Sequence, residues 1–365
     1  MTLTSPLGSP VGPMPQRAAG MDAAPPRRGG APGPYAALDL GTNNCRLLIA
    51  RPTIDGFRVV DAFSRIVRLG EGLSQTGRLS EAAIARTIAA LAVCRDKMRL
   101  HGVQRARLIA TEACRSAENG EQFLAEVRER LGIQLEIVDR ETEAHLAAAG
   151  CGALADRAAQ SIVLFDIGGG SSEIVWLSCE KGRGEAAWSD SAAQRIEAWE
   201  SLRLGVVTLA EKFGGHEVSD EIFAAMVQFV AGQLAPFTVR MAGQTRCAHF
   251  HLLGTSGTVT TIAGVHLNLP RYDRRQVDGL WLTSGEVDAT IGRLRAMSYA
   301  QRSANPCIGH ERADLVLAGC AILEAIRQSF PAERIRIADR GLREGILTQL
   351  MSADRVGPRG AGVDA

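Results

Sequence analysis

Several features that would assign a sequence to a class at once are missing from this one. Its eight cysteines include no C-x-x-C pair, which argues against a thiolate metal cluster and is typical of reduced thiols in a cytoplasmic protein. No apolar run reaches the ~18 residues of a spanning helix, so we expect no transmembrane segment and no membrane partner. The net charge is only +1, so no global field favours a nucleic-acid partner, and any polyanion site must be basic locally. The seven histidines show no metal-ligand spacing.

The composition predicts two folded domains between two unfolded ends. A chain of 365 residues, at roughly 100–200 residues per domain, holds two. Residues 1–34 contain eight of the fourteen prolines and little aliphatic bulk, so they are predicted to be a disordered leader, or in part sequence upstream of a start at Met14 or Met21. The other expected units are a first domain at 35–141, a second at 142–343, a helix at about 344–352 that returns to the first domain, and a disordered tail at 353–365.

The most informative stretch, residues 161–173, reads SIVLFDIGGGSSE. Its apolar, β-branched run predicts a strand that is buried on both faces and ends near Asp166. The glycines at 168–170 can adopt positive φ and leave backbone N–H groups uncovered, so an anion can approach closely. Two serines add hydroxyl donors, and Glu173 adds a second carboxylate. The stretch predicts a phosphate-binding turn between two strands; the alternative is a tight turn whose glycines only permit the bend.

The same pattern occurs at two other places in the chain. The run Asp39-Leu-Gly-Thr-Asn43 follows one apolar strand and precedes another, and Gly254-Thr-Ser-Gly-Thr258 follows a third. Two Asp-x-Gly hairpins indicate a duplicated domain that closes on a phosphate chain from both sides. Between these turns, short apolar strands alternate with helices, which is typical of the α/β class. We expect helices at 80–99, 120–131, 219–242, 284–296 and 311–329, and strands at 106–110, 135–139 and 335–338; the polar stretch 178–197 fits no element.

With these motifs in the same order, the sequence resembles the exopolyphosphatase and guanosine pentaphosphate phosphohydrolase (Ppx/GppA) family over about residues 36–350. The matching motifs are Asp39-Leu-Gly-Thr-Asn, Asp166-Ile-Gly-Gly-Gly-Ser-Ser-Glu173, Gly254-Thr-Ser-Gly-Thr, Glu311-Arg-Ala-Asp314 and Asp339-Arg-Gly-Leu-Arg-Glu-Gly345. The resemblance implies the fold of actin, sugar kinases and heat-shock ATPases, in which two ribonuclease-H-like α/β domains flank an active cleft. It also implies Mg²⁺-assisted phosphoanhydride hydrolysis and a homodimer.

The sequence departs from the family pattern at a few positions. Asn44 stands where many relatives have Ser, and Arg140 and Thr142 stand where many have Gly and Glu. Longer relatives continue beyond the position of Gly345 into a helical phosphohydrolase-like domain. The sequence resembles the short form of the family.

The resemblance also assigns roles to four carboxylates. Glu143 matches the family's catalytic glutamate, a general base that takes a proton from the attacking water; the alternative is a first-turn glutamate that complements the helix dipole. Asp39, Asp166 and Glu173 suit Mg²⁺, a hard cation with oxygen ligands, or they cap turns at strand ends. Which of the three contacts the ion is left open.

Phosphate oxygens have two groups of expected partners. The resemblance places Arg46, Arg115 and Arg312 in the phosphate site, where a guanidinium fork meets the oxygens bidentately. In contrast, Arg343 is expected to be structural and paired with a nearby carboxylate. The other expected donors are Asn43, Gly168, Gly169, Gly170, Ser171, Ser172, Thr255, Ser256 and Gly257. The last three could instead, or also, cap a helix.

Four functions follow from these residues. The favoured one is the release of orthophosphate from the ends of inorganic polyphosphate. The second is the conversion of guanosine pentaphosphate to tetraphosphate with the same machinery. A kinase of the same fold is less favoured because no adenosine pocket is recognisable. A non-enzymatic nucleotide sensor is least favoured, because it would have lost the catalytic carboxylate and Glu143 is present.

Overall fold

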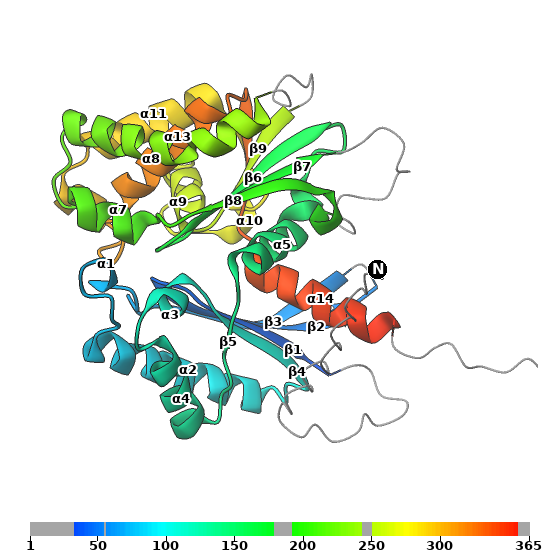
Figure 1. The fold of residues 1–365 in the computed structure, drawn as a ribbon. Helices are drawn as coiled ribbons and strands as arrows, with labels where there is room; N and C mark the ends of the chain where they lie inside the picture. Colours follow the sequence, from blue (N-terminus) through cyan, green and yellow to red (C-terminus); the bar gives the residue numbers. More distant parts are fainter. Residues whose placement is uncertain (1–32, 55, 179–191, 243–249, 357–365) are drawn as a thin grey trace, which may run out of the picture. The chain divides into compact units, whose positions relative to one another are not determined.

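The computed structural model describes residues 33–54, 56–178, 192–242 and 250–356 (Figure 1). Residues 1–32 of the predicted leader lie outside the described part of the chain. Most of the predicted tail lies outside it as well. Residues 353–356, which we expected in the tail, belong instead to the last helix. The unplaced stretch 178–197 is described at its two ends only.

The first sheet has five strands in the order β3-β2-β1-β4-β5. They are β1 (Tyr35–Leu40), β2 (Asn44–Thr53), β3 (Gly56–Ile66), β4 (Arg105–Ala110) and β5 (Glu136–Ile137). Strand β1 pairs antiparallel with β2 and parallel with β4. Side chains alternate along β1 so that Leu38 and Leu40 join one core and Tyr35 and Ala37 join another, which explains why the run is apolar throughout.

The second sheet has six strands in the order β10-β11-β9-β6-β7-β8. They are β6 (Ser161–Ile167), β7 (Ser172–Ser178), β8 (Ile196–Leu202), β9 (Phe250–Thr255), β10 (Trp281–Thr283) and β11 (Arg334–Ala338). Strands β6, β7 and β8 form an antiparallel meander, and β6, β9 and β11 run parallel. Apart from β10, this repeats the plan of the first sheet. The predicted class, an α/β protein with two sheets, is confirmed.

Helices cover both faces of each sheet. In the first half they are α1 (Leu73–Thr76), α2 (Glu81–Leu100), α3 (Glu112–Ser116), α4 (Gly120–Leu131) and α5 (Arg140–Cys151). In the second half they are α7 (Val206–Phe213), α8 (Asp220–Met241), α9 (Gly257–His266), α10 (Arg274–Val277), α11 (Ser284–Ala296), α12 (Tyr299–Ala304), α13 (Val316–Ser329) and α14 (Leu342–Val356). The helices α2 and α4 pack on one face of the first sheet and α14 on the other (Figure 1). The largest core lies between the second sheet and the helices α7, α8, α9, α11 and α13.

The helices α5 and α14 cross in close contact beside both sheets (Figure 1). Their backbones meet at two glycines: a Cβ at Gly150 would overlap the carbonyl oxygen of Gly341, and one at Gly345 would overlap that of Leu146. The packing of α14 on β1 through Ile346 and Leu347 agrees with a C-terminal helix that returns to the first domain. The domain boundaries themselves stay a prediction.

Two elements differ from the sequence expectations. The helix α13 begins at Val316 rather than near Glu311, because residues 309–315 form turns that bring polar side chains toward the rest of the fold. The strand β5 spans only Glu136–Ile137, since it pairs with just the last two residues of β4.

The helix α8 bears on the expectation that the chain has no transmembrane segment. By length and composition it could cross a membrane, although we expected no such segment. A single helix of this kind is weak evidence for a span, because the core helix of a globular domain passes the same test. Phe223, Met226, Val230 and Leu234 of α8 are buried in the core of the second sheet, where α8 packs against α13. Core packing accounts for its composition.

Candidate active site

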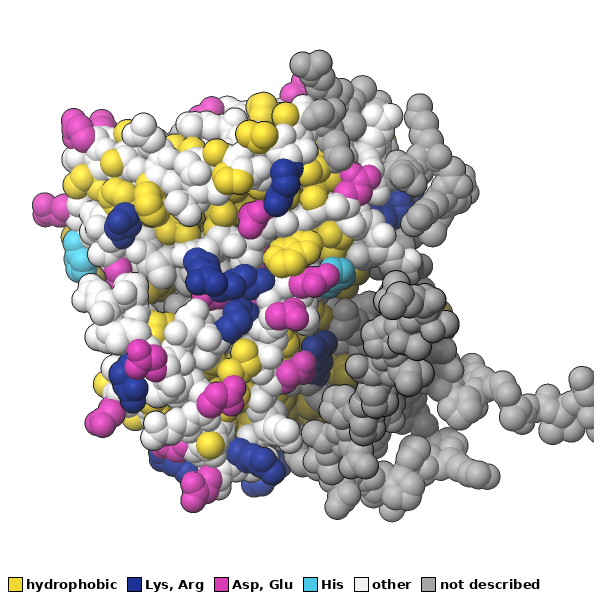
Figure 2. Space-filling model, in the orientation of Figure 1, with side chains coloured by type: hydrophobic (Ala, Val, Ile, Leu, Met, Phe, Trp, Pro, Cys, Tyr) yellow, Lys and Arg dark blue, Asp and Glu magenta, His cyan; other side chains and the backbone are white. Residues whose placement is uncertain are grey.

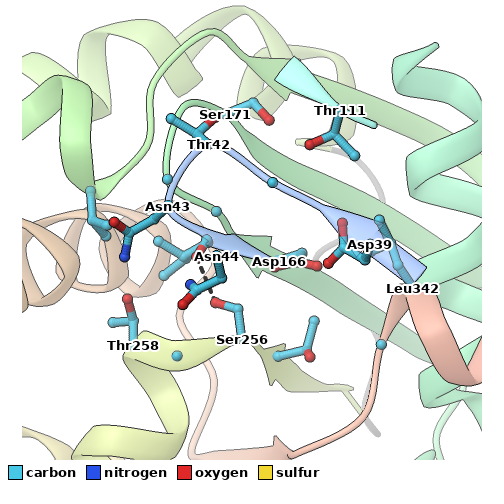
Figure 3. A pocket seen from close by; sticks show the side chains of 18 of the residues that line it. Asp39, Thr42, Asn43, Asn44, Thr111, Asp166, Ser171, Ser256, Thr258 and Leu342 are labelled. Atoms are coloured by element: carbon cyan, nitrogen blue, oxygen red, sulfur yellow. Dashed lines mark hydrogen bonds between the residues drawn. The ribbon is translucent and has the colours of Figure 1, made fainter. Parts of the chain in front are cut away.

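The two Asp-x-Gly turns meet at one cavity, which encloses about 1160 Å³ including its open mouth. A Cβ added at Gly169 would lie 3.0 Å from the Thr42 Cβ and 3.1 Å from the Asn43 nitrogen, so the glycine turn of the second sheet packs directly on the turn of the first. Figure 3 shows the carboxyl groups of Asp39 and Asp166 turned toward one another across this contact. The duplication thus places two strand-end aspartates at one site.

Six carboxylates line the cavity, and the pKa values of the four that were predicted as site residues are all raised. Burial raises the pKa of Asp166 to about 6, with a further contribution from the charge of Asp39. Burial raises the pKa of Glu143 to about 7, although Arg115 opposes the shift. Burial also raises the pKa of Asp39 and, well above its usual value, that of Glu173. In the ligand-free protein, burial therefore disfavours the charged forms of these four carboxyl groups.

Glu143 lies near the start of α5, where the N-cap Asp139 accepts a hydrogen bond from the Thr142 N–H at 2.7 Å. The residue is only 4% exposed. Arg115 of α3 donates to Glu143 Oε1 at 2.5 Å and to the carbonyl of Val138 at 2.6 Å. Arg115 therefore fixes the position of the glutamate, and it is not among the residues that line the cavity.

Arg115 is held in turn by Glu112, which was not among the predicted site residues. Glu112 accepts from Arg115 at 2.5 Å, from Arg140 at 2.9 Å and from the Ser116 hydroxyl at 2.6 Å. Although burial opposes it, these donors hold the pKa of Glu112 below its usual value. The departure from the family at Arg140 therefore adds a second cation to this buried network. The i,i+3 spacing of Glu112 and Arg115 on a short helix is the signal that could have shown the pair.

The glycine turn is anchored to α7. The carbonyls of Gly168 and Gly169 accept hydrogen bonds from the N–H groups of Val206 and Val207 at 3.0 and 2.9 Å. The Gly168 N–H donates to the carbonyl of Ser171 at 3.0 Å within the turn. Among the described residues, no backbone or side-chain acceptor is recorded for the N–H groups of Gly169 and Gly170. These two amides are the ones available to an anion in the cavity.

A helix N-terminus provides the opposite wall. The helix α9 begins at Gly257, and the first-turn N–H groups of a helix have no partner within it. A Cβ at Gly257 would lie 3.6 Å from Arg312 Nη1 and 3.9 Å from Arg46 Nη2, so two guanidinium groups gather there. Ser256, the residue before the helix, has φ 83°, a backbone strain that is typical of functional turns. Positive groups and free amides therefore converge on one point.

The hydroxyl groups of this region have other partners. The hydroxyl of Thr255 donates to the carbonyl of Arg340 at 2.5 Å, and that of Ser256 donates to the carbonyl of Ile167 at 2.5 Å. The hydroxyl of Ser172 donates to the carbonyl of Leu204 at 2.8 Å, and Ser172 is fully buried outside the cavity lining. These three side chains brace the turns instead of offering a proton to a ligand.

Most predicted site residues are brought together. The cavity is lined by Asp39, Asn43, Arg46, Glu143, Asp166, Gly168, Gly169, Gly170, Ser171, Glu173, Thr255, Ser256, Gly257 and Arg312. Arg115 and Ser172 are the two predicted residues that do not line it. Residues that line it without having been predicted include Thr42, Glu112, Thr258 and Arg343. The roles assigned to the predicted residues stay predictions.

The acidic side of the cavity fits a hard cation that is held jointly with a ligand. Within the described residues, no three His, Cys, Asp or Glu side chains are grouped to hold a metal by themselves. Mg²⁺ commonly takes one or two carboxylates and completes its shell with waters and substrate phosphates. The carboxyl groups of Asp39 and Asp166 line the cavity, and the buried Asn43 and Asn44 Oδ1 atoms have no hydrogen-bond partner among the described residues, so oxygen ligands are available for such an ion.

Comparisons with known proteins agree on one family. Residues 48–354 match the model of the Ppx/GppA phosphatase family. The chain is 29% identical over 328 residues to exopolyphosphatase 2 of Mycobacterium tuberculosis, covering 86% of this chain and 98% of that protein. It is 30% identical over 320 residues to a guanosine-5'-triphosphate,3'-diphosphate pyrophosphatase of Aeromonas salmonicida, covering 87% of this chain but 59% of that protein. The crystal structure of the Aquifex aeolicus Ppx/GppA family member superposes with a TM-score of 0.70 at 27% identity, covering 88% of this chain and 98% of that one.

Proposed function

Because this chain belongs to the Ppx/GppA phosphatase family, we propose that it hydrolyses terminal phosphoanhydride bonds and releases orthophosphate from inorganic polyphosphate. The observation that carries the proposal is the placement of Glu143, a buried carboxylate with a pKa raised to about 7, in the same cavity as the glycine turn and the α9 N-terminus. A phosphate cradle beside a tuned base is what the hydrolysis of a phosphoanhydride needs.

In this proposal the terminal phosphate lies between the glycine turn and α9. The amides of Gly169 and Gly170 and the first turn of α9 would donate to its non-bridging oxygens. Arg46 and Arg312, which meet beside Gly257, would balance the charge that develops on the equatorial oxygens. Basic side chains also gather in the middle of one face, in the region where Figure 1 draws α3 (Figure 2). A chain of further phosphates has local positive charge to follow, although the net charge is only +1.

Glu143 supplies the proton acceptor. Its carboxylate would take a proton from a water molecule as the water oxygen bonds to the terminal phosphorus and the bridging P–O bond breaks. The electron pair of that bond leaves with the shortened chain, and the proton passes to solvent or to the released phosphate. Arg115 holds Glu143 at one oxygen and leaves the other for water.

A divalent cation fits this site through Asp39, Asp166 or Glu173. When bound, Mg²⁺ would neutralise phosphate oxygens and so weaken the repulsion between the substrate and the buried carboxylates of the cavity. The three carboxylates would orient the ion.

Guanosine pentaphosphate is the second candidate substrate. Relatives named for that type of substrate match as well as the relatives named exopolyphosphatase, at 30% and 29% identity, and the same cavity could accept a 5'-triphosphate end. Homodimerisation and a cytoplasmic location are further parts of the proposal that rest on the family alone.

One assay tests the proposal. Purified protein is supplied with long polyphosphate, guanosine pentaphosphate or ATP, with Mg²⁺ or with excess chelator, and orthophosphate release is measured. We expect release from polyphosphate in Mg²⁺ and none in chelator. Faster release from guanosine pentaphosphate would select the second candidate, release from ATP alone would contradict both, and full activity in chelator would contradict the metal role.

A further inference from the structure

The structure assigns a third arginine to the phosphate site. We propose that Arg343, which we expected to be structural, binds phosphate oxygens in the cavity together with Arg46 and Arg312. The inference rests on the proposed function, because it takes the ligand to be a phosphoanhydride chain. It adds one binding residue to the proposed site.

Two of the carboxylates near Arg343 already have other partners. Glu344, its neighbour in α14, accepts from Arg274 at 2.9 Å through one oxygen and from the Gly341 N–H at 2.9 Å through the other. Asp339 accepts from the Tyr272 hydroxyl at 2.7 Å and lies 3.6 Å from Arg274. In the part of the chain that the structure describes, no hydrogen bond or ion pair is recorded for the Arg343 guanidinium.

The position of Arg343 is unfavourable for a cation unless an anion is bound. It lies in the first turn of α14, a helix of 15 residues, where the helix dipole repels positive charge. It lines the cavity near Asp39, but Arg46 is close by as well. Burial lowers the pKa of Arg343, and the charge of Arg46 lowers it further. The carboxylates of Glu344 and Asp39 oppose the shift but do not cancel it. A phosphate group between the two arginines would relieve both the repulsion and the loss of hydration.

The position of Arg343 in the sequence also supports a role in binding phosphate. The strand β11 ends at Ala338, parallel to β9 and on the same side of the sheet as the ends of β6 and β9. The turn that follows, Asp339–Gly341, therefore reaches the same edge as the Asp166 turn and the α9 N-terminus. Thr255, in the turn before α9, donates to the Arg340 carbonyl. This hydrogen bond fixes the Asp339–Gly341 turn against the turn before α9. Arg343 follows directly and is carried to the cavity wall.

Binding of tripolyphosphate by calorimetry tests the inference. All variants carry Glu143→Gln so that the ligand is not hydrolysed, and each must show the parent's circular dichroism spectrum. Removing one charge-assisted contact of about 1.5–3 kcal/mol corresponds to a roughly ten- to hundredfold rise in Kd for Arg343→Met. Arg343→Lys, which keeps the charge and the fold but loses the fork, should fall between. The control is Arg334→Met on the exposed side of β11, whose guanidinium pairs with Asp156; its Kd should not change.

Salt dependence separates a ligand contact from a structural effect. Losing one phosphate contact should reduce the slope of log Kd against log salt by roughly one, by analogy with polyanion binding. A Kd or a slope unchanged in both Arg343 variants would overturn the inference. If the Glu143→Gln parent itself binds no tripolyphosphate, the proposed function fails, which is a different outcome from a parent that binds and Arg343 variants that bind equally well.

Discussion

At the scale of single residues, the cavity combines carboxylates and guanidinium groups that the fold keeps apart. Arg115, which does not line the cavity, contacts Glu143 directly. Asp39, Asp166 and Glu173 have raised pKa values because burial removes water without supplying a full counter-charge. Perturbed pKa values of this kind gather at functional sites. Two predictions follow from individual members of the set.

Replacing Glu143 by Gln should remove the proton acceptor and keep its size. We expect kcat to fall roughly 10²–10⁴-fold, the usual contribution of a positioned base, with KM little changed. In the parent, kcat/KM should rise with pH through about 7, because the base must be deprotonated and the pKa of Glu143 is raised to about 7. Glu141→Gln, on the exposed side of the same helix turn, is the control. If the Glu143→Gln enzyme turns over at the parental rate, Glu143 has no part in the mechanism.

Replacing Asp166 by Asn should stabilise the ligand-free protein at high pH. The folded pKa is raised from 3.8 to about 6, so the stability from the protonated form is present below about pH 4 and is lost as pH rises through about 6. At pH 8 the buried charge costs roughly 2–3 kcal/mol, at 1.36 kcal/mol per pKa unit. We expect Tm in chelator to rise by several degrees at pH 8 and hardly at pH 4.

Asp156→Asn is the matched control for that measurement. The Ala158 N–H and Arg334 hold the pKa of Asp156 below its usual value, so its removal should give no gain in Tm at pH 8. Equal effects of the two substitutions would show that burial of the Asp166 charge is not the cause.

At the scale of elements, the crossing of α5 and α14 connects the helix that carries the proposed base with the helix that carries the proposed phosphate ligand Arg343. The helix α5 carries Glu143 near its start, and α14 carries Arg343 near its start. The backbones approach so closely at Gly150 and Gly345 that neither position has room for a Cβ. The relative position of the proposed base and the proposed phosphate ligand therefore depends on two glycines that contact no substrate.

Gly150→Ala should push the two helices apart. We expect a loss of about 1–3 kcal/mol in the free energy of unfolding, the usual cost of overpacking, and a fall in kcat because Glu143 moves. Gly232→Ala in α8 is the control: nothing lies within 4 Å of the added Cβ, so it should stabilise by about 0.5–1 kcal/mol through helix propensity. Chemical denaturation measures both. A neutral Gly150 variant would mean that the crossing is not tightly packed.

The elements themselves were largely readable from the sequence. Continuous apolar runs predicted β1 and β6, because these strands are buried on both faces, and apolar residues three to four apart predicted α2, because one face of a helix is buried. The start of α13 could not be predicted, since residues 311–315 read as helical locally and are held in turns by contacts such as that of Arg68 with Asp314. In the cavity, motif order predicted which turns meet. It did not show that Thr255, Ser256 and Ser172 donate to backbone carbonyls, because those acceptors are 32 to 89 residues away.

At the scale of the whole described molecule, the two sheets are joined beside the cavity by a few polar contacts. Arg68, which follows β3, donates to both oxygens of Asp314 at 3.0 Å and to the Glu311 carbonyl at 3.0 Å. Glu211 of α7 accepts from the Gly72 N–H at 2.8 Å and from the Ser74 hydroxyl. Arg68 has φ 47°, a conformation that costs of order 1 kcal/mol or more outside glycine. The contact to Glu311 lies next to Arg312 in the chain, so this connection also positions a proposed phosphate ligand.

Breaking that connection should loosen substrate binding more than chemistry. For Arg68→Asp we expect KM for polyphosphate to rise roughly three- to tenfold, less than a fully buried charged hydrogen bond would give because Arg68 is partly exposed. The fall in kcat should be smaller, since Glu143 and its network lie on other elements. The reciprocal double variant, Arg68→Asp with Asp314→Arg, restores opposite charges and should reverse part of the rise in KM, which a double-mutant cycle measures.

The control is Arg130→Asp, whose parent side chain forms an exposed pair with Glu126 on α4; it should leave KM unchanged. If KM stays at the parental value in Arg68→Asp, or if the charge swap recovers nothing, the contact does not control access of the substrate to the site.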